Sequence, residues 1–184
     1  MKKTTKRKSR NIASFLLVSL IICLFGVVYW QEDQITTPKE DIPMPTELNE
    51  TVAQKRDELI SLAADKGINV VITADFRSSE EQDELYAQGR TTDGDIVTNA
   101  KGGESYHNYG LAIDFALMNI NGEVVWDMEY DGNGNSQSDW SEVVEIAKSL
   151  GFDWGGDWVS FKDYPHFQMN FGLSIEDLQN GERP

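Results

Sequence analysis

Apolar residues recur at helical spacing in two stretches of the chain, residues 49–66 and 139–150. This spacing places the apolar side chains on one face of a helix. Gly67 and Gly151 directly follow the two stretches, and glycine commonly ends a helix. We therefore expect two amphipathic helices that each bury one face. Their inward residues are Val52, Leu59 and Ala63 in the first helix, and Val143, Ile146, Ala147 and Leu150 in the second.

Three other stretches alternate between apolar and other residues, as a strand with one buried face does. They are residues 69–77, 111–117 and 166–171. Each predicted strand has an apolar face for the core and an opposite face that carries Arg77, Asp114 or His166. The predicted core positions are Val70, Ile72, Ala74 and Phe76, then Leu111, Ile113, Phe115 and Leu117, then Phe167, Met169 and Phe171.

A short helix is predicted after the first of these strands. Ser78 and Glu81 have the spacing of a capping box, as do Ser79 and Gln82, and a loop over residues 90–106 follows. Helices and strands mix without a strict βαβ rhythm, which favours an α+β domain with a mainly antiparallel sheet. The chain has 184 residues, enough for a single compact domain with one sizeable core.

The N-terminal part of the chain has the composition of a membrane anchor and a tether. Residues 11–30 carry no charge, and about 20 apolar residues suffice to cross a bilayer as a helix. The basic tail, residues 1–10, then stays cytoplasmic. Because no small-x-small site follows, an uncleaved anchor is favoured over a cleaved signal peptide. Residues 31–48 contain three prolines and form a linker, so residues 49–184 are expected to lie outside the cell membrane, or to be secreted if the segment is cleaved.

Charge is distributed unevenly along the chain, whose formal net charge is -15. Six of the 16 basic residues lie in the first ten positions, whereas the first of the 31 acidic residues is Glu32. Such an acidic domain argues against nucleic acid as a partner, because phosphate binding depends on a basic surface. Cys23 is the single cysteine and lies in the anchor, so the exported domain holds no disulfide.

The two histidines of the chain, His107 and His166, are candidate metal ligands. Two imidazoles and one carboxylate, here Asp114, form a normal ligand set for catalytic zinc, which keeps a fourth position for water. Asp163 could act as the general base and Arg77 could stabilise the oxyanion of a tetrahedral intermediate. Spacing alone leaves another interpretation open, because histidines are more often satisfied polar residues and the two aspartates could be caps or turn residues.

A second metal site is considered in residues 131–142. Oxygen-bearing side chains there occupy positions 1, 3, 5, 9 and 12 of an EF-hand-like calcium loop. Against calcium, Ser136 stands where Gly is expected, and clusters of Asn, Gly and Asp are more often turns. Both interpretations stay open. The candidate calcium ligands are Asp131, Asn133, Asn135, Asp139 and Glu142.

Further side chains are candidates for the surroundings of the zinc site. Asp157 is expected either to orient a zinc-bound histidine or to be solvated at the surface. Trp158 is expected beside the substrate groove, and Trp126 in the core. Ser105 is expected to hydrogen-bond the metal loop or the substrate, because no third histidine exists to activate it as a nucleophile.

Several strings in the sequence carry a family resemblance. They are Phe76-Arg-Ser, Glu81-Gln82, Leu85-Tyr86 with Gly89-Arg90, Ser105-Tyr-His-Asn-Tyr-Gly-Leu-Ala-Ile-Asp-Phe115, Trp154-Gly-Gly-Asp-Trp158 and Asp163-Tyr-Pro-His-Phe-Gln168. Together they resemble the L-alanyl-D-glutamate peptidases of the zinc D-alanyl-D-alanine carboxypeptidase family, which also includes phage endolysins and vancomycin-resistance carboxypeptidases. The resemblance covers residues 50–172.

The resemblance implies a role for individual residues. It makes His107, Asp114 and His166 the zinc ligands, Asp163 the catalytic base, and Arg77 the match of the early strand arginine of the family. Gln82 and Gln168 belong to the same motifs and are expected to contact the substrate or the side chains around the metal. The fold that it implies is the compact α+β fold shared with hedgehog signalling domains.

The last motif resembles the endopeptidase branch, because the carboxypeptidases tend to show a Glu and a Trp there. We therefore expect zinc-dependent hydrolysis of the L-Ala–D-Glu bond in the stem peptides of peptidoglycan. One alternative is a D-alanyl-D-alanine carboxypeptidase. An alternative of another class is a non-catalytic zinc module that binds the wall or a partner, against which the presence of Asp163 and Arg77 argues.

Overall fold

The structure is a computed structural model that describes residues 42–184. The predicted basic tail, the predicted anchor and most of the predicted linker fall on residues 1–41, outside the described residues. Within the described part of the chain, no helix has both the length and the apolar character needed to cross a membrane.

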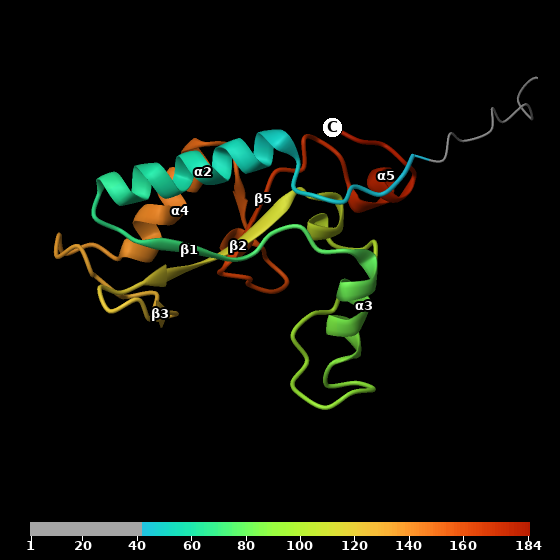
Figure 1. Cartoon of the computed structure of the whole chain (residues 1–184), viewed down its shortest axis with the longest axis horizontal. Coiled ribbons are helices and arrows are strands. Elements are labelled where there is room, and N and C mark those ends of the chain that lie inside the picture. Colours follow the sequence, from blue (N-terminus) through green and yellow to red (C-terminus); the bar gives the residue numbers. More distant parts are fainter. Residues whose placement is uncertain (1–41) are drawn as a thin grey trace, which may run out of the picture. The chain divides into compact units, whose positions relative to one another are not determined.

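Five strands form one antiparallel sheet, as the alternating pattern predicts. They are β1 (Val70–Ala74), β2 (Ala112–Met118), β3 (Val124–Val125), β4 (Asp153–Trp154) and β5 (His166–Gln168). Their order is β1, β2, β5, β4, and the short β3 also pairs with β2. β2 therefore has three partners, and Figure 1 shows it in the middle of the domain. The register pairs Asp114 of β2 with Ala74 of β1 and with His166 of β5.

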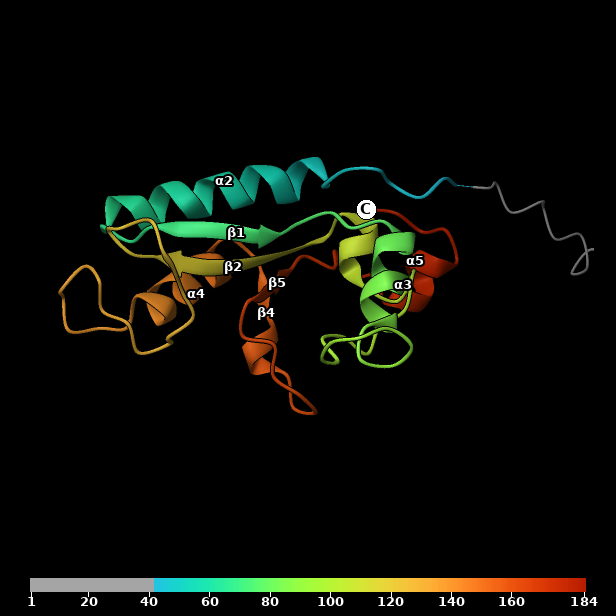
Figure 2. The ribbon, with the colours of Figure 1, turned by 60° about the horizontal axis from the view of Figure 1, so that its bottom comes forward.

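Two helices supply the apolar side chains that pack on this sheet. α2 (Glu50–Asp65) and α4 (Asp139–Ser149) match the two predicted amphipathic helices, and Figure 2 shows α2 running alongside β1. The inward side chains of the two helices form one core cluster with the apolar face of β2 and with Phe167. All the inward helix residues that the sequence predicts are buried except Leu150, which is partly buried. Within this core the rings of Phe115 and Phe167 stack at 4.7 Å between centroids. Burying a large apolar side chain of this kind stabilises the fold by about 1.5–3 kcal/mol.

The third predicted helix, α3 (Ser79–Ala87), begins as the sequence indicates. Ser78 and Glu81 form the capping box, because each side chain accepts a hydrogen bond from the backbone N–H of the other. α3 extends away from the sheet and continues into the predicted loop (Figures 1 and 2). The sequence did not predict β3, β4, the 3-10 turns η1 (Tyr106–Tyr109) and η2 (Gly155–Asp157), or α5 (Ile175–Gln179).

Four predicted core residues are wrong. Ala74 and Phe76 are only partly buried and lie outside the core cluster, because the register shifts after Ile72 and β1 ends at Ala74.

The other two lie at the ends of predicted or short strands. Phe171 is 45% exposed because β5 ends at Gln168 and the backbone turns into the left-handed region at Phe171, with a φ of 52°. Trp126 is 55% exposed, because it follows the short strand β3; its ring lies 6.4 Å from that of Trp140 between centroids.

Candidate metal centre

The sheet and one tight turn bring three candidate ligands together. Asp114 and His166 are direct partners on β2 and β5, so their side chains leave the same face of the sheet. His107 lies on η1, which is capped by Ser105: the Ser105 hydroxyl accepts a hydrogen bond from the backbone N–H of His107. Gly110 ends the turn in the left-handed region, with a φ of 66°. Ser105 therefore contacts the backbone of the loop that carries His107.

The ligand atoms of the three side chains form a nearly equilateral triangle. His107 Nε2 lies 3.3 Å from His166 Nδ1 and 3.3 Å from Asp114 Oδ1, and His166 Nδ1 lies 3.2 Å from the same oxygen. Two ligands of tetrahedral zinc, each bonded at about 2.0–2.1 Å, are about 3.3 Å apart. The donor set and its spacing therefore fit zinc. Among residues 42–184, this is the single group of three or more His, Cys, Asp or Glu side chains that gathers in this way.

Each histidine has a hydrogen-bond partner on the ring nitrogen that faces away from the triangle. His107 Nδ1 lies 2.6 Å from the backbone carbonyl oxygen of Asp75, and His166 Nε2 lies 3.0 Å from Gln168 Oε1. Both partners are acceptors, so these nitrogens carry the proton and donate. The inner nitrogens then keep their lone pairs, which is the tautomer that a metal requires.

The electrostatics of the triangle couple its members. Burial alone would raise the pKa of Asp114, but hydrogen bonds and charge from His107 and His166 hold that pKa well below its usual range. Burial would lower the pKa of His166, but the hydrogen bond and charge of Asp114 raise it. Asp114 therefore stays an anion and attracts positive charge into the triangle, whether from protons or from a cation.

Asp163 lies next to the triangle with a free carboxylate. Its backbone N–H donates to Gly155, and its carbonyl oxygen accepts from His166 N–H, so the segment between them is fixed. Within the described part of the chain its carboxylate has no hydrogen bond and no ion pair. Burial raises the pKa of Asp163, more than the charge of His166 lowers it. A half-buried, unpaired carboxyl with a raised pKa is suited to proton transfer.

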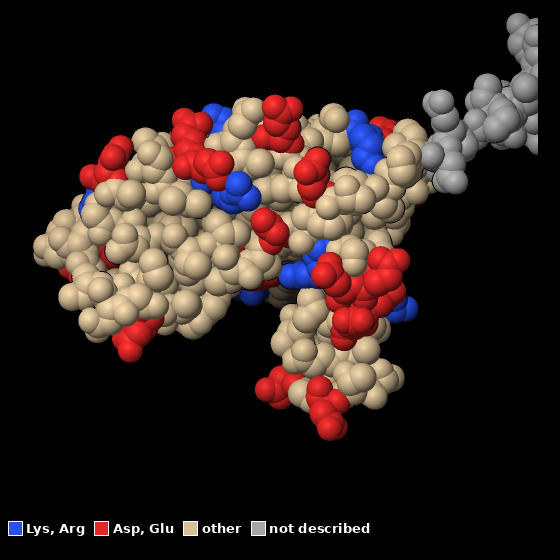
Figure 3. All heavy atoms as spheres, in the orientation of Figure 1, with Lys and Arg blue, Asp and Glu red and all other residues tan. Residues whose placement is uncertain are grey.

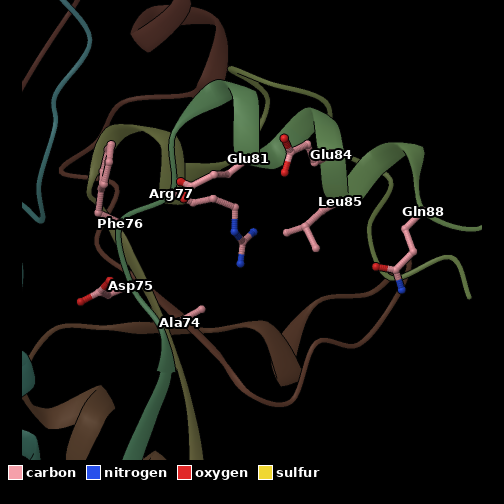
Figure 4. Close-up of a pocket in the computed structure, with 8 residues that line it drawn as sticks. All are labelled: Ala74, Asp75, Phe76, Arg77, Glu81, Glu84, Leu85 and Gln88. Atoms are coloured by element: carbon pink, nitrogen blue, oxygen red, sulfur yellow. The ribbon is translucent and has the colours of Figure 1, made fainter. Parts of the chain in front are cut away.

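Arg77 reaches the triangle from the end of β1. Its Nη2 lies 4.0 Å from Asp114 Oδ2, the oxygen outside the triangle, and its Nη1 donates to Gln82 Oε1 at 2.9 Å. Figure 4 shows the guanidinium pointing into a hollow between the end of β1 and α3. This hollow has a volume of about 440 Å³ and is also lined by Leu85 and Gln88.

A second hollow, of about 550 Å³, lies beside β4 and β5. It is lined by Trp158 and Gln168, and the Trp158 ring lies 5.1 Å from the His166 ring. Trp158 thus lines this hollow, and its contact with the substrate stays a prediction. Asp157 lines the same hollow and pairs at the surface with Lys148, 2.6 Å away.

The expectation of calcium at residues 131–142 gains no support. Glu142 Oε1 lies 2.9 Å from Lys66 Nζ, and Oε2 accepts from the side-chain amides of Asn133 and Asn135. Asp131 accepts two backbone N–H groups of the loop, and Asp139 accepts that of Gly132. Glu142 and Asp131 are thus held by donors of the chain, and Lys66 supplies the positive charge at Glu142, whereas Asp139 Oδ1 is buried without a hydrogen-bond partner within the described residues.

Sequence reasoning missed Asn108, which joins the metal loop to Arg77. Its side-chain oxygen accepts from the backbone N–H groups of Gly103 and Ser105, and its amide donates to the carbonyl oxygens of Arg77 and Ser78. Asn108 follows Ser105 by three residues, which is the spacing of a capping box, so this signal was present in the sequence. The contact of Asp75 with His107 has no such signal, because a backbone carbonyl can belong to any residue.

Acidic side chains dominate the surface near this site. On the face drawn in Figure 3, Asp and Glu gather over α3, Lys and Arg are scattered among them, and the surface is hollowed between α3 and the sheet.

An α+β domain that combines this His, Asp, His group with a free carboxylate and an arginine has the features of a metal-dependent hydrolase.

Comparisons with known proteins identify the family. Residues 98–169 match the family model described as D-alanyl-D-alanine carboxypeptidase. The chain is 66% identical over 130 residues to the peptidoglycan L-alanyl-D-glutamate endopeptidase CwlK of Bacillus subtilis (strain 168), covering 71% of this chain and 78% of that protein. The chain belongs to the D-alanyl-D-alanine carboxypeptidase family, as its motifs predict.

Two more distant relatives were also found. The L-alanyl-D-glutamate peptidase of Listeria phage A118 is 34% identical over 115 residues, which cover 62% of this chain and 35% of the phage protein. The crystal structure of Serratia marcescens L-Ala D-Glu endopeptidase ChiX is 23% identical, covers 73% of this chain and 95% of that chain, and has a TM-score of 0.44.

Proposed function

We propose that this chain is a zinc-dependent endopeptidase that hydrolyses the L-Ala–D-Glu bond in the stem peptides of peptidoglycan. The observation that carries the chemistry is the triangle of ligand atoms from His107, Asp114 and His166, with edges of 3.2–3.3 Å. The choice of bond rests on the name of the Bacillus subtilis relative, which is 66% identical.

His107, Asp114 and His166 would hold the ion through the three atoms of the triangle. Zinc bound there would act as a Lewis acid on the scissile carbonyl and would lower the pKa of a bound water to about 7. The role of the chain is to hold this site in one geometry. Asp75 and Gln168 fix the histidine rings, and the register of β2 and β5 fixes Asp114 against His166.

Asp163 supplies the proton transfers of the reaction. Its carboxylate takes a proton from the attacking water and returns it to the departing amine nitrogen of the glutamyl residue. The absence of a partner for this carboxylate among residues 42–184 leaves its oxygens available for both transfers. Its raised pKa makes it a better proton acceptor than an ordinary aspartate.

Arg77 acts on the oxygen of the scissile carbonyl. As the water oxygen bonds to the carbonyl carbon, negative charge develops on the carbonyl oxygen, and a fixed cationic donor stabilises that charge. The guanidinium is already directed into the hollow beside Asp114, so little reorganisation is needed (Figure 4).

Mass spectrometry of muropeptides digested with the zinc-loaded protein tests this function. The expected product carries a new free amino terminus on D-Glu. Release of terminal D-Ala instead would favour the carboxypeptidase. No hydrolysis by the zinc-loaded protein would favour a non-catalytic module that binds the wall.

We also propose that residues 11–30 anchor the enzyme in the cell membrane, with the catalytic domain on the outer side. The support is the uncharged composition of this segment and the basic residues before it. Fractionation of cells tests the location. The full-length chain should sediment with membranes after a salt wash, and a shortened, released chain would instead indicate a cleaved signal peptide.

A further inference from the structure

Gln82 is a buried polar side chain whose hydrogen bonds end on Arg77. Its exposed fraction is 0%, although it lies on α3 in a stretch of exposed acidic residues. Gln82 Nε2 donates to the carbonyl oxygen of Ala100 at 2.8 Å and to Thr98 Oγ1 at 3.3 Å. Because the amide nitrogen faces these acceptors, the amide oxygen must face the Arg77 guanidinium, 2.9 Å away.

The backbone of Arg77 is held by other groups. Its N–H donates to the carbonyl oxygen of His107 at 3.2 Å, and its own carbonyl oxygen accepts from Asn108 Nδ2 at 2.9 Å. These bonds fix the backbone position of Arg77 but not the position of its guanidinium group. The one hydrogen bond of the guanidinium within the described residues is that to Gln82.

The guanidinium also has an attractive alternative partner. Arg77 Nη2 lies 4.0 Å from Asp114 Oδ2, whereas a direct guanidinium–carboxylate hydrogen bond is about 2.8 Å long. An arginine that closed this gap would draw negative charge away from the metal ligand and would move away from the substrate. The bond to Gln82 opposes that movement.

We propose that Gln82 is a positioning residue that keeps the Arg77 guanidinium apart from Asp114 and directed at the substrate carbonyl oxygen. The inference rests on the proposed hydrolysis. Gln82 acts through Arg77, because its own side chain is closed off from the substrate. The loop that carries Thr98 and Ala100 thereby becomes part of the support of the active site.

Steady-state kinetics on a soluble muropeptide that contains the L-Ala–D-Glu bond test the inference in the zinc-loaded full chain. Gln82→Met keeps the size of the side chain and removes its hydrogen bonds. We expect kcat to fall about 10- to 100-fold, with KM changed less than about threefold, because the lost interaction belongs to the transition state. Gln54→Met makes the same chemical change on the exposed side of α2 and should leave both constants unaltered.

The decisive measurement is the double variant. If Gln82 acts through Arg77, then Arg77→Ala with Gln82→Met loses no more kcat than Arg77→Ala alone, within about twofold. A loss equal to the product of the two single losses would overturn the inference, because it would indicate a purely structural role. Should Gln82→Met fail to fold, Thr98→Val removes one acceptor of the Gln82 amide and is combined with Arg77→Ala in the same way. An inactive wild type would overturn the proposed function itself, whereas an active wild type with multiplicative losses would overturn the role of Gln82 alone.

Discussion

Gln168 Oε1 lies 3.0 Å from Nε2 of His166, two residues earlier on the same strand. Residues two apart on a strand share a face, so β5 presents a ligand and the partner that orients it together. The consequence is that Nδ1 of His166, and not Nε2, faces Asp114 and His107.

This relationship predicts the effect of Gln168→Leu on metal binding. The substitution keeps the size of the side chain but leaves His166 Nε2 without its acceptor, so the ring loses its fixed tautomer and orientation. We expect zinc affinity to fall about 10- to 100-fold, measured by competition with a chromogenic chelator. Gln168→Glu retains an acceptor and should bind zinc at least tenfold more tightly than Gln168→Leu. Equal affinities in the two variants would show that the hydrogen bond does not matter for the metal.

Substitution of Gly110 tests how much the stability of the fold depends on the backbone conformation of the loop that carries His107. An added Cβ would clash with the carbonyl oxygen of Glu47, and the φ of 66° already disfavours a side chain. Gly122 has a similar φ of 79° and no atom within 4 Å of an added Cβ, so it is the matched control. We expect Gly122→Ala to cost about 1–2 kcal/mol in the free energy of unfolding, and Gly110→Ala to cost about 1–3 kcal/mol more. Urea denaturation measures both, and equal costs would mean that the chain near Glu47 moves aside.

The sequence predicted the strands that carry the metal ligands, but it did not predict which strands lie side by side. Alternation placed Asp114 and His166 on polar strand faces, and the register makes them direct partners. Alternation identifies a face but not the strand that lies beside it, so spacing alone left the metal ligands open. Motif resemblance supplied what periodicity did not.

Other features depended on contacts that no local pattern contains. Lys66 and Glu142 are 76 positions apart, so the loop suggested a calcium ligand where the fold provides a lysine. Phe171 continued an alternating pattern, but the strand pairing ends before it. Trp126 is large and apolar, yet the two residues of β3 are too short a strand to bury it.

The Lys66–Glu142 pair predicts a pH dependence of stability. The hydrogen bond and charge of Lys66 lower the pKa of Glu142, so this contribution is present above about pH 4.3 and is lost as the pH falls through the folded-state pKa. The hydrogen bond and charge of Glu142 raise the pKa of Lys66, so the contribution is present below about pH 10.4 and is lost as the pH rises further.

The stability difference between wild type and Lys66→Met should therefore be constant between about pH 5 and 10 and shrink on either side. Urea denaturation across this range measures it. Lys55→Met removes an exposed pair with Glu58 on α2 and should change stability little at any pH. A Lys66→Met variant as stable as wild type at pH 7 would show that the ion pair contributes nothing.

Addition of calcium should not raise the melting temperature of wild type, since Lys66 already supplies the positive charge at Glu142.

Asp163→Asn predicts a loss of activity without a loss of metal. Asparagine has nearly the same shape but cannot accept and return a proton, so kcat should fall about 10²- to 10⁴-fold. The zinc content should stay at one ion per chain, because the side chain of Asp163 lies outside the triangle formed by His107, Asp114 and His166. Asp65→Asn makes the same change at an exposed position of α2 and should leave kcat unaltered. Hydrolysis of muropeptides and metal analysis of the same samples separate the two effects. Full activity of Asp163→Asn would assign the proton transfer to another group, and lost zinc would mean that Asp163 supports the metal rather than the reaction.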